Sequence, residues 1–223
     1  MREFGILLGF LFLCVVMSIL SDRFLTLSNL TIILRQTSIN AILAAGMTFV
    51  IISAGIDLSV GSIVALTGVI AASIAVNGYG IAAAVMGGLM VSVIVGAFNG
   101  YIIGKHTIPP FICTLSTMII VRGLALVYTK GYPVFGLPAG YKFIGSGFLL
   151  SIPMPVIIMG FVYLATSFVL KHTNMGFYTF AIGGNEEATR LSGVNVIRYK
   201  IKIYTLNGLL AGVAGIVLSS RLN

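Results

Sequence analysis

Asp57 is the one acidic residue in the middle of the long apolar stretches, and its carboxylate could take part in chemistry there. It lies in ISAGIDLSVGSIVALTG, residues 52–68, two positions before Ser59. A carboxylate at membrane depth costs about 2.5–3.5 kcal/mol on insertion scales, so it needs a partner, water or a role. Asp57 could bind a proton or an ion in a transport pathway. It could equally cap the helix that follows, where free N–H groups favour a negative charge.

Gly55 and Gly61 bracket a predicted interruption between two helices. Gly55 can form the C-terminal cap of the first helix, and Asp57 or Ser59 can cap the second. Irregular backbone at membrane depth is tolerated only where it is buried in protein or lines a cavity. We therefore expect a broken or re-entrant segment near 54–61, inside a helix bundle or at the rim of a water-filled pathway.

The elements that must hold this segment are membrane helices. The chain is 58% hydrophobic and only 8% charged, with a mean hydropathy of +1.11, and water cannot solvate such a surface. We predict one all-α, polytopic membrane helix bundle over residues 1–223, with a polar connection at 24–38 that forms an interfacial helix. About seven spans have the required length: 4–20, 38–54, 61–77, 81–104, 109–128, 152–170 and 201–220.

The net charge of +8 could indicate nucleic acid in a soluble protein. Here the basic residues lie mostly between the apolar runs, so they indicate membrane topology and we expect no nucleic-acid partner. If the N-terminus is inside, Lys and Arg are in excess on the inner side, mostly within 171–202. We therefore predict that the N-terminus and residues 171–200 are cytoplasmic, and that residues 129–151 lie outside.

Small residues recur at every fourth position of the fourth predicted span. They are Gly80, Ala84, Gly88, Ser92, Gly96, Gly100 and Gly104. Small residues at this spacing form one strip on which another helix backbone can approach closely. The strip predicts a tightly packed helix and says nothing by itself about transport.

A short helix is predicted within the polar segment that follows the sixth span. Asn185 can be its N-cap, Glu186 and Glu187 fill the first turn, and Arg190 and Gly193 come towards its end. Ala188 and Leu191 complete the segment 185–193, which is too short and too polar to span a membrane. Such a helix docks onto another surface, or it is a solvated loop with one helical turn.

Residues suited to catalysis, metal binding or a cofactor do not gather in the sequence. His106 and His172 are far apart, each beside a lysine at the end of a span, and Cys14 and Cys113 fall inside apolar runs. No Walker-type glycine loop, Ser/His/Asp arrangement or Cys/His cluster is present. We expect a non-catalytic protein without cofactor or metal, so that any ATP site lies on another chain.

Two long stretches closely resemble the ribose-type monosaccharide permeases, the membrane subunits of bacterial ATP-binding-cassette importers, in a superfamily that includes branched-chain amino acid permeases. They are RQTSINAILAAGMTFVIISAGIDLSVGSIVALTGVIAASIAV at 35–76 and AIGGNEEATRLSGVNV at 181–196. The resemblance implies a type II importer permease fold in the bacterial inner membrane. It also implies a second permease copy (homodimer or heterodimer), an ATPase subunit inside and an extracytoplasmic sugar-binding protein outside.

The same resemblance implies a role for the short helix. Glu187-Ala188-Thr189 followed by Gly193 fits the family's cytoplasmic E-A-A-x-x-x-G pattern, with Thr in place of the second Ala. Residues 171–200 would then be the coupling loop, and residues 185–193 the helix that sits in a cleft of the ATPase. Permeases of this kind run on for roughly another hundred residues of further spans, so we expect the C-terminal part of the family to be missing here.

Two alternatives stay open beside the sugar importer. An ion- or proton-coupled secondary transporter would use Asp57 as its coupling carboxylate. A permease fragment without transport activity would fit the early end of the chain.

Overall fold

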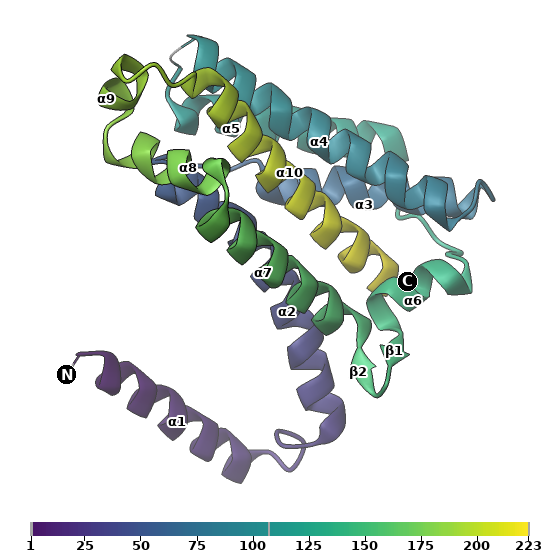
Figure 1. Cartoon of the computed structure of the whole chain (residues 1–223). Coiled ribbons are helices and arrows are strands. Elements are labelled where there is room, and N and C mark those ends of the chain that lie inside the picture. Colours follow the sequence, from purple (N-terminus) through teal and green to yellow (C-terminus); the bar gives the residue numbers. More distant parts are fainter. Residues whose placement is uncertain (1, 107, 223) are drawn as a thin grey trace.

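The computed structural model describes residues 2–106 and 108–222, which fold almost entirely into helices (Figure 1). The prediction of an all-α membrane bundle is confirmed. In order, the elements are α1 (Arg2–Leu20), α2 (Leu27–Ile52), α3 (Val60–Val76), α4 (Ile81–His106), α5 (Pro110–Thr129), α6 (Ala139–Ser146), β1 (Phe148–Leu149), β2 (Ile152–Pro153), α7 (Met154–His172), α8 (Asn174–Gly184), α9 (Glu186–Leu191) and α10 (Val196–Arg221).

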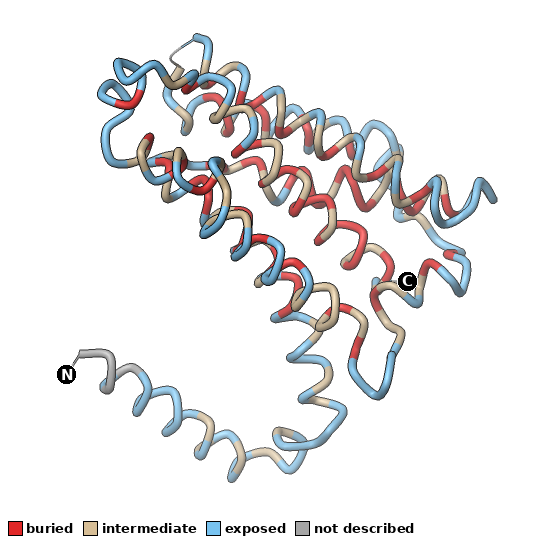
Figure 2. Tube along the Cα trace, in the orientation of Figure 1, coloured by how far each residue is buried: buried red, intermediate tan, exposed pale blue. Residues whose placement is uncertain are grey.

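Helix α10 forms the centre of the bundle. It packs most extensively on α4, then on α3 and α2, and its far end lies against α6. Figure 2 shows buried residues along almost its whole length. Small residues make this possible, because glycines and alanines recur on α10 and let three neighbours approach its backbone.

The predicted count of seven spans is not confirmed. Within the described residues, five helices are long and apolar enough to cross a membrane: α2, α4, α5, α7 and α10. Two further apolar helical stretches, Leu7–Leu20 within α1 and Val60–Val76 (α3), are shorter. The bundle is thus polytopic, with two short apolar helices beside the five long ones.

The predicted polar connection at 24–38 is wrong, because α2 is continuous from Leu27 to Ile52. Its hydroxyl side chains donate to carbonyls one turn back, so they satisfy themselves without interrupting the helix. Thr31 donates to the Leu27 carbonyl at 2.8 Å, and Ser38 to the Leu34 carbonyl at 2.6 Å. Thr26 caps the start of the helix by accepting from the Asn29 N–H.

The connection 129–151 contains α6 and part of a small hairpin. Strands β1 and β2 pair antiparallel, with Leu149 opposite Ile152. Leu150 and Ser151 form the turn, both with positive φ, as a two-residue hairpin of right-handed twist requires. Arg35 of α2 holds the hairpin base: its Nη2 donates to the Ser146 carbonyl at 2.6 Å, and its guanidinium lies 4.7 Å from the Phe148 ring centre.

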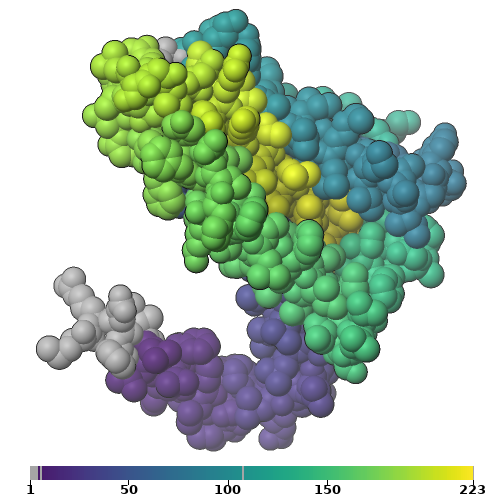
Figure 3. Space-filling view, viewed as in Figure 1, coloured from purple at the N-terminus to yellow at the C-terminus, as the bar shows by residue number. Residues whose placement is uncertain are grey.

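Helix α1 and the first turns of α2 extend away from the rest of the chain (Figures 1 and 3). Large apolar side chains on α1 are exposed, for example Leu8 at 65% and Phe12 at 70%. The outer faces of α4 and α5 are similarly apolar, with Met90 and Ile120 exposed. Hydrocarbon is the solvent that suits such surfaces.

Candidate functional site

The interruption between α2 and α3 begins with a turn that two backbone hydrogen bonds close. After Ile52, the Ala54 N–H donates to the Ile51 carbonyl at 3.0 Å and the Gly55 N–H donates to the Val50 carbonyl at 2.9 Å. These two bonds form a Schellman motif, in which one residue takes a left-handed conformation. That residue is Ala54, with φ of 58°, so the prediction that Gly55 would be the cap is wrong by one position.

A glycine is required at position 55 because a side chain there would have no room. A Cβ at Gly55 would lie 2.7 Å from the Tyr204 hydroxyl, and that hydroxyl donates to the Ile56 carbonyl at 3.2 Å. The interruption is therefore fastened to α10. Gly61 differs, because an added Cβ there would meet no atom within 4 Å.

Asp57 is buried at the centre of this segment, with 4% of its surface exposed. Its Oδ1 accepts from the Ser59 N–H at 2.9 Å and from the Ser59 hydroxyl at 2.6 Å. Its Oδ2 accepts from Asn207 Nδ2 at 2.8 Å. Ser59 is the N-cap residue of α3 but makes no side-chain cap bond. The capping prediction is thus wrong in form: Asp57 closes the turn before α3, and its second oxygen binds α10.

The Ser59 hydroxyl is one link in a buried chain of hydrogen bonds. Thr117 of α5 donates to Asn99 Oδ1 at 2.7 Å, and Asn99 Nδ2 of α4 donates to the Ser59 hydroxyl at 2.9 Å. Ser59 in turn donates to Asp57. All these side chains are buried, with Asn99 and Ser59 at 0% exposure. Every bond in the chain runs towards Asp57, which is its final acceptor.

Together, Asp57, Ser59, Asn99, Thr117 and Asn207 connect the interruption to α3, α4, α5 and α10. We call these five residues the Asp57 network. Three of its members, Asn99, Thr117 and Asn207, were missed from the sequence. The available signal was an amide in an otherwise apolar span, because Asn99 and Asn207 each needed a buried partner.

The strip of small residues on α4 is packed from Ala84 onwards, where Ala84 itself is buried in a cluster with Ala71 and Ala75 of α3. A Cβ at Gly100 would lie 2.6 Å from Ile201 Cα, and one at Gly104 would lie 3.3 Å from Ile197 Cα, so both glycines lie against the α10 backbone. Gly96 meets α10 in the same way, at Tyr204 and Gly208. Gly88 faces α3, and the buried Ser92 stands between them in the strip. The first residue, Gly80, precedes α4 in the turn and faces open space.

The predicted short helix is α9, at the opposite end of the bundle from α6 (Figure 1). Asn185 caps it as expected, accepting from the Ala188 N–H at 2.9 Å. Gly193 follows its last turn with φ of 86°, again in a Schellman motif, since the Val194 N–H donates to the Thr189 carbonyl at 3.4 Å. Helices lie on both sides of α9: α8 precedes it, and α10 begins at Val196, earlier than the predicted start of the last span at residue 201.

Two ion pairs involve the charged side chains of α9. Lys200 Nζ of α10 lies 2.6 Å from Glu186 Oε1, and the Lys200 side chain is only 14% exposed. Arg190 pairs with Glu187 at 2.7 Å on the surface. This hydrogen bond and the charge of Glu187 raise the pKa of Arg190 above its usual range. The Leu191 side chain is 79% exposed. Helix α9 is therefore attached to α10 by the Glu186–Lys200 ion pair and exposes one apolar side chain, Leu191.

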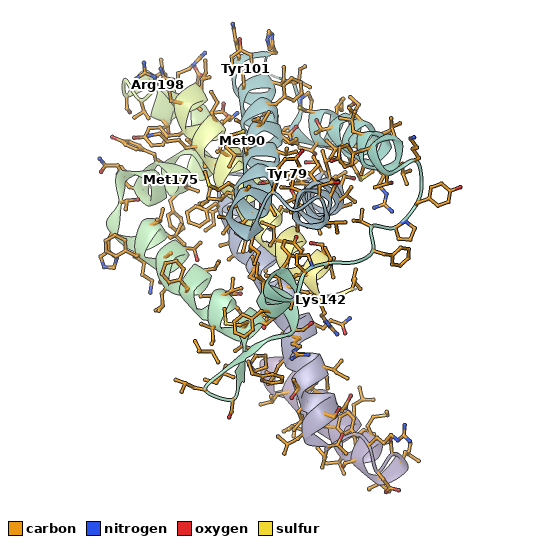
Figure 4. All side chains as sticks on the ribbon, turned by 90° about the vertical axis from the view of Figure 1, so that its right-hand side faces the viewer. Tyr79, Met90, Tyr101, Lys142, Met175 and Arg198 are labelled. Carbon is orange, nitrogen blue, oxygen red and sulfur yellow. The ribbon has the colours of Figure 1, made fainter. Side chains whose placement is uncertain are left out.

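Titratable groups do not form a metal site in the part of the chain that the structure describes, where no three His, Cys, Asp or Glu side chains come together. Figure 4 shows Arg198 and Tyr101 near one end of the molecule and Lys142 well away from both, so these basic side chains lie in separate regions. The structure thus contains a buried hydrogen-bond network around Asp57, the close-packed pair α4 and α10, and the short helix α9 at one end of the bundle.

Comparison with known proteins gives one family and several relatives. Residues 29–223 match the family described as branched-chain amino acid transport system / permease component. A ribose import permease protein of Escherichia coli strain K12 is 48% identical over 221 residues, which cover 97% of this chain and 69% of that protein. Its counterpart in Bacillus subtilis strain 168 is 44% identical, with 100% of this chain and 70% of that protein covered.

More distant relatives include the D-allose transport system permease protein of Escherichia coli strain K12. It is 35% identical over 206 residues, covering 92% of this chain and 63% of that protein. No solved structure matches the chain.

Proposed function

Because the chain belongs to the family of branched-chain amino acid transport system permease components, we propose that it is the permease of an ATP-binding-cassette importer for ribose or a similar monosaccharide. Membership makes it a multi-pass membrane subunit of the inner membrane, with no catalysis of its own. The observation that carries the substrate class is the 48% identity to a ribose import permease over nearly the whole chain.

The proposed importer needs three partners. An ATPase subunit binds α9 on the cytoplasmic side, a sugar-binding protein delivers substrate on the other side, and a second permease copy completes the pathway. Helix α9 supports the first of these, because its caps and the Glu186–Lys200 ion pair hold it in place while Leu191 stays free to enter a partner.

A proton-coupled carrier that uses Asp57 is the rival function. Both oxygens of Asp57 already accept hydrogen bonds, from the Ser59 N–H and hydroxyl and from the Asn207 amide. A buried carboxylate of this kind is satisfied where it stands, which favours a structural role in an importer over a proton-transfer role.

Coupling through α9 can be tested at Gly193. An added Cβ would meet no atom within 4 Å, so a substitution there acts chiefly through the left-handed backbone, at a cost of roughly 1 kcal/mol or more. We expect Gly193→Val to insert normally, to fail to recover the co-expressed ATPase in a pull-down, and to fail to stimulate ATP hydrolysis.

The matched control is Gly184→Val. Gly184 also has open space around it but no positive φ, so this variant should recover the ATPase like the wild type. Equal ATPase recovery by Gly193→Val at equal membrane expression would show that α9 is an ordinary surface turn.

Topology can be tested with single cysteines in a background that lacks Cys14 and Cys113. Leu150 is 89% exposed at the hairpin turn, and the Glu187 side chain is 60% exposed on α9. We expect an impermeant thiol reagent to label Leu150→Cys in intact cells, and to label Glu187→Cys only after the membrane is permeabilised. Labelling in the reverse order would overturn the proposed orientation.

A further inference from the structure

One face of α2 carries uncharged polar side chains in the middle of a membrane span. Gln36, Thr37, Asn40 and Thr48 are exposed there, with the small Ala44 between the last two. The spacing of three and four residues places them on one side of the helix. The opposite side is buried and mostly apolar, formed by residues such as Ile42 and Phe49. We call the exposed residues 36, 37, 40, 44 and 48 the polar face of α2.

The polar face has few partners within the described residues. The side chains of Gln36, Thr37 and Asn40 make no hydrogen bond there, and the Thr48 hydroxyl donates only to the Ala44 carbonyl of its own helix. Hydrocarbon offers polar groups no hydrogen bonds, so amides in a span face protein or a water-filled space. The outer face of α4 shows the contrast, since Met86, Met90, Ile94 and Phe98 follow one another there (Met90 is labelled in Figure 4).

Helix α7 adds a second wall beside the polar face. Thr48 and Phe49 of α2 and Tyr163, Thr166 and Ser167 of α7 line a groove of about 180 Å³. Tyr163 is 46% exposed, so part of this aromatic side chain is accessible. The lining is mainly apolar, with Ala45 and Leu170 completing it, and the hydroxyl-bearing side chains lie among these apolar groups.

We propose that the polar face of α2, with Tyr163 and Ser167 of α7, lines the passage through which the sugar crosses. This inference rests on the proposed function and adds a location to it. Hydroxyl and amide groups both donate and accept, as sugar hydroxyls do, and no residue of the face is charged. Arg35, the nearest cation in sequence, is held by Ser146 and Phe148. Single uncharged contacts of this kind bind weakly, and weak binding at several sites lets a substrate move on.

Thiol accessibility tests the passage independently of transport. In the assembled importer, with Cys14 and Cys113 replaced, Asn40→Cys and Thr48→Cys should react with a small water-soluble thiosulfonate. Ile94→Cys on α4 is the control, because Ile94 is equally a span residue but 59% exposed on an apolar face. We expect the α2 positions to react at least about tenfold faster, since only a hydrated thiol forms the reactive thiolate. Saturating D-ribose with its binding protein and ATP should slow that reaction.

Transport gives the second measurement. Asn40→Leu and Thr48→Val should lower ATP-dependent uptake of labelled D-ribose by about tenfold, the equivalent of one net hydrogen bond. Ser116→Val removes an exposed hydroxyl from the outer face of α5 and should leave uptake unchanged.

The outcomes separate the two proposals. If wild-type uptake of D-ribose is ATP-dependent but the α2 cysteines react no faster than Ile94→Cys, the importer stands and the passage lies elsewhere. If Asn40→Leu instead prevents two permease copies from co-purifying, the polar face is a subunit contact and the inference is wrong. If no ATP-dependent uptake occurs in the wild type, the proposed function itself fails, whatever the reactivity of α2.

Discussion

Gly100→Leu is expected to prevent α4 and α10 from packing and to remove most of the folded protein. A Cβ at Gly100 would already lie 2.6 Å from Ile201 Cα and 2.8 Å from the Lys200 carbonyl oxygen. Both are backbone atoms, so no change of rotamer on α10 can relieve the clash. Overpacking typically costs about 1–3 kcal/mol, and we expect the upper end of that range or more because two helices must separate.

The measurement is the monodisperse fraction and the melting temperature of the purified protein in detergent. Ala82→Leu is the control, since Ala82 is an exposed α4 residue that lies off the strip of small residues. Gly96→Leu should behave like Gly100→Leu, because Gly96 meets the α10 backbone at Tyr204 and Gly208. If all three variants were equally stable, close approach of the two backbones would not be what holds the bundle together.

Asp57→Leu is expected to be nearly as damaging, for a different reason. It would leave the Ser59 N–H, the Ser59 hydroxyl and the Asn207 amide buried without their acceptor. A buried donor without a partner costs about 1–3 kcal/mol, and here several lose the same acceptor. The α2–α3 interruption would also lose its attachment to α10.

Asp57→Asn should fold almost normally. The new side-chain oxygen can accept from Ser59 as before, and the new NH₂ group would face Asn207. Asn207 Oδ1 is buried and has no hydrogen-bond partner in the described structure. Turning over the Asn207 amide therefore presents an acceptor in place of a donor, and the contact is restored with reversed polarity.

Thermal stability and uptake of the two Asp57 variants should be measured beside Asp22→Leu. Asp22 is exposed in the α1–α2 connection, so its replacement controls for the loss of a carboxylate. If Asp57→Asn were as unstable as Asp57→Leu, the charge itself would be essential. If Asp57→Asn folded normally but lost an ATP-independent, pH-dependent uptake, the proton-coupled carrier would be the better function.

Features that depend on local chemistry could be predicted from the sequence. The N-cap Asn185, the left-handed Gly193 and the close packing of the α4 glycines follow from residues within a few positions of each other. Features that depend on distant partners could not. Nothing near Asp57 in the sequence indicates that Asn207 binds it, and the start of α2 was missed because its hydroxyl groups bond within the helix.

The long sequence separation inside the Asp57 network has a consequence for biosynthesis. Asn99 reaches Ser59 across 40 positions, but Asn207 reaches Asp57 only across 150. At about 5–20 residues per second, a ribosome needs roughly 8–30 seconds to synthesise the second of these intervals. Throughout that time the growing polypeptide holds a carboxylate whose last partner has not yet been made. Synthesis of Asn207 is therefore the step that completes the Asp57 network and ties the α2–α3 interruption to α10.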